Sequence, residues 1–140
     1  MAQLTIERPL VQWLEARDAR LARAVFPGFA KPGHRGPYLT YRRVSSERWG
    51  HLKGAAGVSR ARVELNVWSR DHAEARAIAD KVVGTQADPG LDRFAGTMDG
   101  VTVQFAGLLD QGDDGDAGED ATEDVWHRVR SDFTIVWEEG

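Results

Sequence analysis

A chain of 140 residues fits one domain and is long enough to bury a hydrophobic core. The sequence contains no cysteine, which excludes disulfide bonds, thiolate metal sites and cysteine nucleophiles. The net charge is −4, and no apolar run approaches the roughly 18 residues that would span a bilayer, so we expect a protein made in the cytoplasm.

The first predicted element is a helix over residues 10–25. Its apolar residues recur at spacings of four and seven, namely Leu10, Leu14, Leu21 and Val25. Pro9 suits a first helical turn, because its missing N–H would have no intrahelical partner there. Residues 26–37 hold three prolines and three glycines, and they predict an irregular connector.

Residues 38–45, YLTYRRVS, have the length of a β-strand but place a tyrosine and an arginine on each face. The glycine-rich stretch 46–59 predicts a long loop. Residues 60–69 predict a second strand, because apolar residues alternate with a polar face that ends at Trp68.

The second half of the chain predicts one helix and two strands. Asp71 and Glu74 resemble a capping box, and an apolar stripe predicts a helix from there to Gly84. Turn residues dominate the segment after the helix. The remaining assignments are a loop at 85–100, a strand at 101–109, an acidic loop at 110–124 and a long strand at 125–137.

These elements follow the order α-β-β-α-β-β and predict an α+β fold in a single domain. Short connections make each strand pair antiparallel, so we expect a four-stranded antiparallel sheet with two helices packed on one face. The alternation of the strands gives a predicted core of Val63, Leu65, Val67, Val103, Phe105, Phe133 and Ile135.

Charge is distributed unevenly along the chain. Residues 1–62 hold 12 Lys/Arg and four acids, a balance of +8, whereas residues 63–140 hold six Lys/Arg and 18 acids, a balance of −12. Residues 110–124 alone carry eight acids and no base. This asymmetry favours nucleic-acid contact, a charged tail or subunits that meet head to tail.

No catalytic or metal-binding constellation emerges from the sequence. The four histidines, His34, His51, His72 and His127, have no metal-type spacing, and no glycine-rich phosphate loop opens a helix. Asp132 lies within a strand, but no nucleophile or second carboxylate can be paired with it. We therefore expect no catalytic residues, no cofactor and no metal, and a small hydrolase or ligand-binding domain is the least favoured function.

Residues 41–49, YRRVSSERW, mix cationic and aromatic side chains as surfaces that bind single-stranded nucleic acid do. A small nucleic-acid-binding module that uses the basic N-terminal half is therefore an alternative function. The competing interpretation is a strand whose tyrosines pack and whose arginines lie at the surface or at an interface.

Several segments together resemble the tail-completion or tail-terminator proteins of long-tailed phages, prophages and gene transfer agents. Phe26–Pro27 matches a corner that precedes the family's first strand, and Glu74–Ala75 matches its second helix. Matches to the family's strand and loop motifs are Pro37, Tyr41, Val44, Ser45, His51, Leu52, Gly54, Arg62 to Trp68, Arg128, Arg130, Ser131, Asp132, Phe133, Ile135 and Trp137. The acidic segment 110–124 is longer than the family pattern.

The resemblance implies assembly and no enzymatic activity. It implies a homo-oligomeric ring, usually a hexamer, at the head-proximal end of the tail tube, which ends tube polymerisation and joins the tail to the head connector. The implied partners are the major tail tube protein and the connector, with DNA passing through the lumen without specific binding. The implied location is the neck of the virion.

We expect the surface for these contacts to combine large aromatic and cationic side chains, which interfaces favour. Trp68 ends a polar strand face, and Trp49 lies in a long predicted loop. The candidate subunit or tube interface consists of Arg42, Arg43, Trp49, His51, Leu52, Arg62 and Trp68.

The acidic segment 110–124 is expected to be solvated and to bind no metal. An EF-hand loop counted from Asp114 would place Glu119 where glycine is needed and Val125 where glutamate is needed. Millimolar calcium should therefore leave the melting temperature unchanged in a thermal scan. A calcium-dependent rise would show binding to the native state and contradict this prediction.

Overall fold

The computed structural model describes residues 6–28, 36–49, 57–116 and 126–139, with backbone only for 46–49, 114–116 and 139. These described residues form two helices and six strands, with a short 3₁₀ helix, η1 (Ala19–Leu21), after the first helix. In chain order the other elements are α1 (Glu7–Arg17), β1 (Val25–Pro27), β2 (Tyr38–Trp49), β3 (Gly57–Ser69), α2 (His72–Val83), β4 (Phe94–Met98), β5 (Val101–Asp116) and β6 (Trp126–Glu139).

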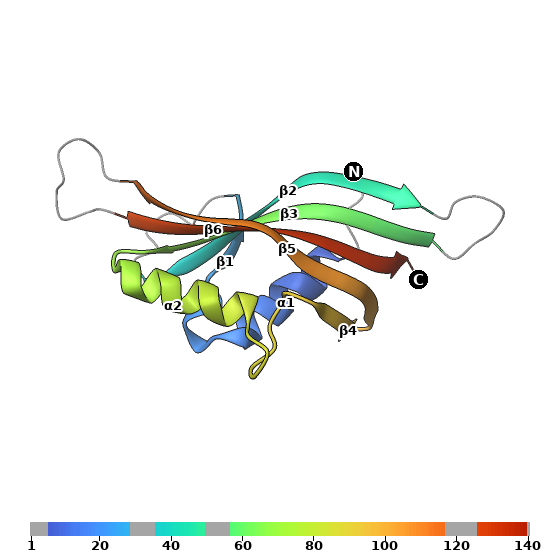
Figure 1. Cartoon of the computed structure of the whole chain (residues 1–140), viewed down its shortest axis with the longest axis horizontal. Helices are drawn as coiled ribbons and strands as arrows, with labels where there is room; N and C mark the ends of the chain where they lie inside the picture. The colour runs from blue at the N-terminus through green and yellow to red at the C-terminus, as the bar shows by residue number, and fades with distance from the viewer. Residues whose placement is uncertain (1–5, 29–35, 50–56, 117–125, 140) are drawn as a thin grey trace.

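The strands form one mixed sheet in the order β1-β2-β3-β6-β5-β4, in which only β1 and β2 are parallel. Both helices lie on one face of this twisted sheet (Figure 1). The predicted four-stranded antiparallel sheet is therefore wrong, because a short strand is added at each edge.

The edge strand β1 replaces the end of the predicted first helix. The helix stops at Arg17, and Asp18 takes an extended conformation and caps η1 through its carboxylate. Arg20 donates hydrogen bonds to that carboxylate, and they lower the pKa of Asp18 against the opposing effect of burial. The apolar spacing identified buried residues correctly, but those residues belong to a helix, a 3₁₀ turn and a strand.

The edge strand β4 lies inside the segment predicted as a loop. It pairs with β5 through a tight hairpin in which Asp99 and Gly100 both have positive φ, 44° and 81°. Such a two-residue turn matches the twist of the flanking strands. The turn signal was present in the sequence, but FAGTM has too little apolar alternation to predict a strand.

The central strands are longer than the sequence predicts. β2 runs to Trp49 and β3 starts at Gly57, so both ends of the predicted loop 46–59 belong to strands. The remaining residues, 50–56, lie outside the described chain. β5 continues to Asp116, so half of the predicted acidic loop is strand, and residues 117–125 lie outside the described chain.

The hydrophobic core lies between the sheet and the two helices. The predicted core residues are buried, apart from Phe105, which is 46% exposed. A β-bulge between Val103 and Phe105 moves Phe105 to the opposite face, which alternation alone could not predict. Trp137 is fully buried beside Val103 and adds the largest side chain to the core.

No helix within the described ranges is long and apolar enough to cross a membrane.

Replacement of Leu65 by alanine tests this core. Leu65 is 1% exposed, and its truncation should lower the free energy of unfolding by about 2–5 kcal/mol. Leu109→Ala is the control, because Leu109 is 52% exposed and should change stability by about 0.5 kcal/mol or less. Denaturant unfolding measures both, and equal effects would contradict the assignment of the core face.

Candidate functional site

The face of the sheet away from the helices is the candidate site, and we call it the open face. Figure 1 shows α1 and α2 beneath the sheet and no helix on its other side. Even-numbered residues of β3 and β6 point to this face, since their odd-numbered neighbours, such as Leu65 and Phe133, are buried under the helices. The strands thus present one entire face without a covering element among the described residues.

An aromatic cluster occupies one end of the open face. Tyr38, Trp68 and Trp126 come from three adjacent strands, and the Tyr38 and Trp68 rings stack with centroids 6.0 Å apart. Trp68 Nε1 donates a hydrogen bond of 3.1 Å to Thr40 Oγ1. These contacts hold the cluster in one arrangement before any partner binds.

Two arginines lie over the aromatic cluster. The Arg70 guanidinium is 5.0 Å from the Trp126 ring centroid, and that of Arg128 is 5.6 Å from the Trp68 ring centroid. Cations over indole rings are attracted by the ring quadrupole. The end of the open face therefore combines the side chains that interface cores favour.

A row of charged side chains crosses the middle of the open face. Arg42 lies 3.3 Å from Glu64, and Arg130 lies 2.8 Å from Asp132 and 3.2 Å from Asp110. Arg62 reaches Asp132 at 3.5 Å. We call these six residues the charge row; they connect four adjacent strands.

The arginines of the charge row are paired with carboxylates of the same chain. Burial disfavours ionised Glu64, but a hydrogen bond from Asn66 and the charge of Arg42 outweigh it and lower the pKa of Glu64. The Asp110 hydrogen bond and the charge of Asp132 raise the pKa of Arg130. Asp132 is therefore a structural ion-pair partner, and no nucleophile or second free carboxylate lies beside it in the row.

The structure places the predicted interface residues in different environments. Arg42, Arg62 and Trp68 share the open face, whereas Arg43 lies opposite Val63 on the helix side, at the exposed edge of β2. The backbone of Trp49 ends β2, and its side chain is outside the described atoms. His51 and Leu52 lie outside the described residues.

Sequence reasoning missed several members of the open face. Trp126, Arg128 and Arg130 share one parity on the last strand, which is the signal that could have placed them with Trp68. The position of Tyr38 opposite Trp68 and of Asp110 opposite Asp132 depends on strand register. A single sequence does not contain that information.

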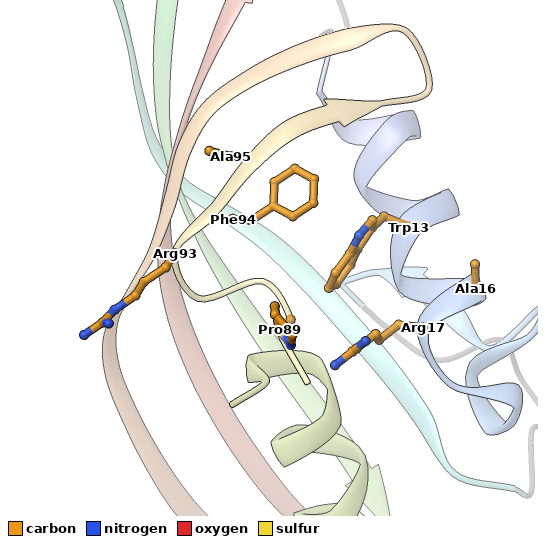
Figure 2. A pocket seen from close by; sticks show the side chains of 8 residues that line it. Trp13, Ala16, Arg17, Pro89, Arg93, Phe94 and Ala95 are labelled. Atoms are coloured by element: carbon orange, nitrogen blue, oxygen red, sulfur yellow. The ribbon is translucent and has the colours of Figure 1, made fainter. Parts of the chain in front are cut away.

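A separate hollow of about 480 Å³ lies between α1 and β4 (Figure 2). Trp13 and Phe94 meet edge to face there, at 5.9 Å between centroids. Arg17 already donates to the Lys81 carbonyl oxygen, and the Arg93 guanidinium points away from Trp13. The lining contains no hydroxyl, imidazole or carboxylate, so it provides neither a nucleophile nor a general base.

The histidines within the described chain belong to the helix-covered side. His72 and His127 lie edge to face at 5.5 Å, and His72 Nε2 is 3.2 Å from the Asp113 carboxylate. His34, like His51, lies outside the described residues. Within the ranges that the structure describes, no three His, Cys, Asp or Glu side chains gather in a way that could hold a metal ion.

Comparison with known proteins identifies the family. Residues 8–138 match the family model described as Tail completion protein gp17. No curated protein matches the chain significantly by sequence. Among solved structures, the fold is similar to that of a chain from "Virion of native gene transfer agent (GTA) particle".

That structural match has 16% identity, a TM-score of 0.56, and covers 98% of this chain and 100% of the other. Such a low identity establishes a common fold and nothing more. The family model, in contrast, spans nearly the whole sequence. The chain therefore belongs to the Tail completion protein gp17 family of phage tail structural proteins.

Proposed function

We propose that this protein forms a homo-oligomeric ring, most simply a hexamer, at the head-proximal end of the tail tube. The ring ends tube polymerisation and joins the tail to the head connector, while DNA passes through the lumen without specific binding. Membership of a tail completion family supports this proposal, as does a fold similar to a chain of a gene transfer agent virion. The proposed location is the neck of the virion, after synthesis in the host cytoplasm.

The observation that carries this proposal is the composition of the open face. The four long strands of the open face have no covering helix among the described residues, and three half-buried aromatic side chains, Tyr38, Trp68 and Trp126, gather at one end of it. Large aromatic and arginine side chains are enriched at protein interfaces. We infer that the open face contacts other protein subunits in the assembled tail.

The aromatic cluster is suited to this role because it is already ordered. Trp68 is fixed by its hydrogen bond to Thr40 and by its stack on Tyr38. Binding by pre-ordered side chains loses less conformational entropy. In the proposed interface, Trp68, Arg42 and Arg62 contribute from the open face and Arg43 from the strand edge, and Trp49, His51 and Leu52 stay predictions.

The alternative function, a nucleic-acid-binding module, is favoured by the two arginine–tryptophan contacts, which resemble a stacking platform. However, a platform for single strands needs accessible ring faces. The Trp68 ring already stacks on Tyr38 and lies beneath Arg128, and the charge row pairs its cations with carboxylates. These contacts favour a protein interface.

Removal of the protein tests the proposed function. Particles made without it should contain filled heads that are not joined to tails, together with tails of unregulated length, because tube growth has no terminator. Electron microscopy of particles made with and without the gene measures both features, and complementation with the intact gene is the control. Tails of normal length joined to heads in the deletion would contradict the proposal.

A further inference from the structure

We propose that a basic hollow on the open face of each copy binds carboxylates from the acidic segment 110–124 of the next copy. The basic hollow is lined by Ser45, Arg60, Arg62, Leu109 and Thr134. The carboxylates that it binds are those of Glu119, Asp120, Glu123 and Asp124. This inference rests on the proposed ring and names a contact between its subunits.

The basic hollow extends across three neighbouring strands and has a volume of about 320 Å³. Ser45 of β2 is opposite Arg62 of β3, and Arg62 is opposite Thr134 of β6. An arginine on the central strand is therefore flanked by a hydroxyl group on each side. Guanidinium and hydroxyl groups both donate hydrogen bonds to carboxylates, and the charged donor makes the stronger bond.

Arg62 has the charge and the exposure to bind a further anion. Its Nη2 is 3.5 Å from Asp132 Oδ2, whereas Arg130 Nη1 is 2.8 Å from the same oxygen. Asp132 is thus held more closely by Arg130, and the Arg62 side chain stays 48% exposed. Arg60 lies two residues from Arg62 on the same strand, about 7 Å away, and lines the same hollow. None of the described side chains that line the hollow is a carboxylate.

The acidic segment supplies the complementary charge. It carries eight acids, and no Lys or Arg occurs from Asp110 to His127. The side chains of Asp110 and Asp113 pair with Arg130 and Arg76 of their own chain, at 3.2 Å and 2.9 Å. The carboxylates farther along the segment have no cation beside them in the sequence, and a block of like charges repels itself. A cationic partner relieves that repulsion.

The basic hollow cannot take the acidic segment of its own copy. Asp116 and Trp126 are opposite each other where β5 ends and β6 begins. Thr134 lies eight residues along β6 from Trp126, about 26 Å at the rise of a strand. Asp120, the acid farthest from both strand ends, is four residues from Asp116, and an extended chain of that length spans about 14 Å. The segment therefore reaches a basic hollow only in another copy.

The separation of the two surfaces makes the contact head to tail. Each copy inserts its acidic segment into the hollow of one neighbour and receives the segment of the other neighbour. Such a heterologous contact repeats around a ring. Because exposed ion pairs add little affinity but discriminate between partners, the contact selects the neighbouring copy and its orientation.

Carbodiimide coupling tests this contact, since the reagent joins a lysine amine to a carboxylate that lies against it. Arg62→Lys keeps the positive charge in the hollow and supplies the amine. Treated particles should give covalent dimers and higher oligomers of this chain on a denaturing gel. Mass spectrometry of these oligomers should find the introduced lysine joined to residues 110–124.

The matched control is Arg8→Lys, at an exposed position of α1. Its introduced lysine should not be joined to residues 110–124 under the same treatment. Three outcomes with Arg62→Lys would overturn the contact. They are a product that stops at the dimer, which indicates a two-fold exchange; coupling to a different tail protein; and no coupled product, as expected if DNA phosphates occupy the hollow.

Neutral substitutions give a second test that needs no reagent. Arg62→Gln removes the cation, and the neutral-segment variant carries Glu119→Gln, Asp120→Asn, Glu123→Gln and Asp124→Asn. Each should reduce incorporation into particles about fivefold or more, because the lost contact recurs at every subunit boundary. The combined variant should lose no more than either one, since both changes remove the same contact.

The control for net charge neutralises four exposed acids elsewhere, with Asp80→Asn, Asp88→Asn, Asp99→Asn and Glu138→Gln. It should be incorporated like the wild type. The melting temperature of each purified variant shows that the chain still folds. Normal incorporation of a folded Arg62→Gln or neutral-segment chain, or losses that multiply in the combined variant, would overturn the contact.

The proposed function is judged separately by the deletion experiment. Defective tails in the deletion combined with no coupling at Arg62→Lys would retain the ring and reject this contact. Normal tails in the deletion would reject both.

Discussion

The structure depends on the uninterrupted pairing of β3 with β6. Their register runs from Gly57 opposite Glu139 to Ser69 opposite His127 without a bulge. This one register therefore decides on which face of the sheet each side chain of both strands lies. Leu65 and Phe133 lie under the helices, and Trp68 and Arg128 lie on the open face. A slip of one residue would exchange the two faces, and it would expose the core and bury the charge row.

The helix-covered face and the open face have different functions in this arrangement. α1 and α2 remove the apolar side of the sheet from water, and that burial provides the stability of the isolated chain. The open face adds matched ion pairs and an ordered aromatic cluster, which give it a fixed shape. A tail component needs this combination, since its fold must be stable before it meets a partner.

The sequence predicted those parts of the fold whose signal is local. The alternation of β3 and the cap and apolar stripe of α2 were sufficient to place these elements. The short strand β1 was missed because pairing with β2 creates it, as the hydrogen bond from Leu39 N to the Ala24 carbonyl oxygen shows. The strand β4 was missed because FAGTM has too little apolar alternation, although its hairpin turn is local. Phe105 was misplaced because a bulge reverses parity. For the candidate site, alternation was sufficient to place Arg42, Arg62 and Trp68 on one face of their strands. The charge row could not be predicted, because its contacts depend on the register of four strands.

The chain order of the strands has a consequence for biosynthesis. β6 is the last of the six strands along the chain, yet it occupies the middle of the sheet between β3 and β5. Until it leaves the ribosome, β3 and β5 lack their shared neighbour, and two long strands present unpaired edges. Pairing over such a sequence separation is also slow, because a long loop must close first. The nascent chain is therefore exposed to aggregation until β6 has emerged and paired, and this favours rapid insertion of that strand.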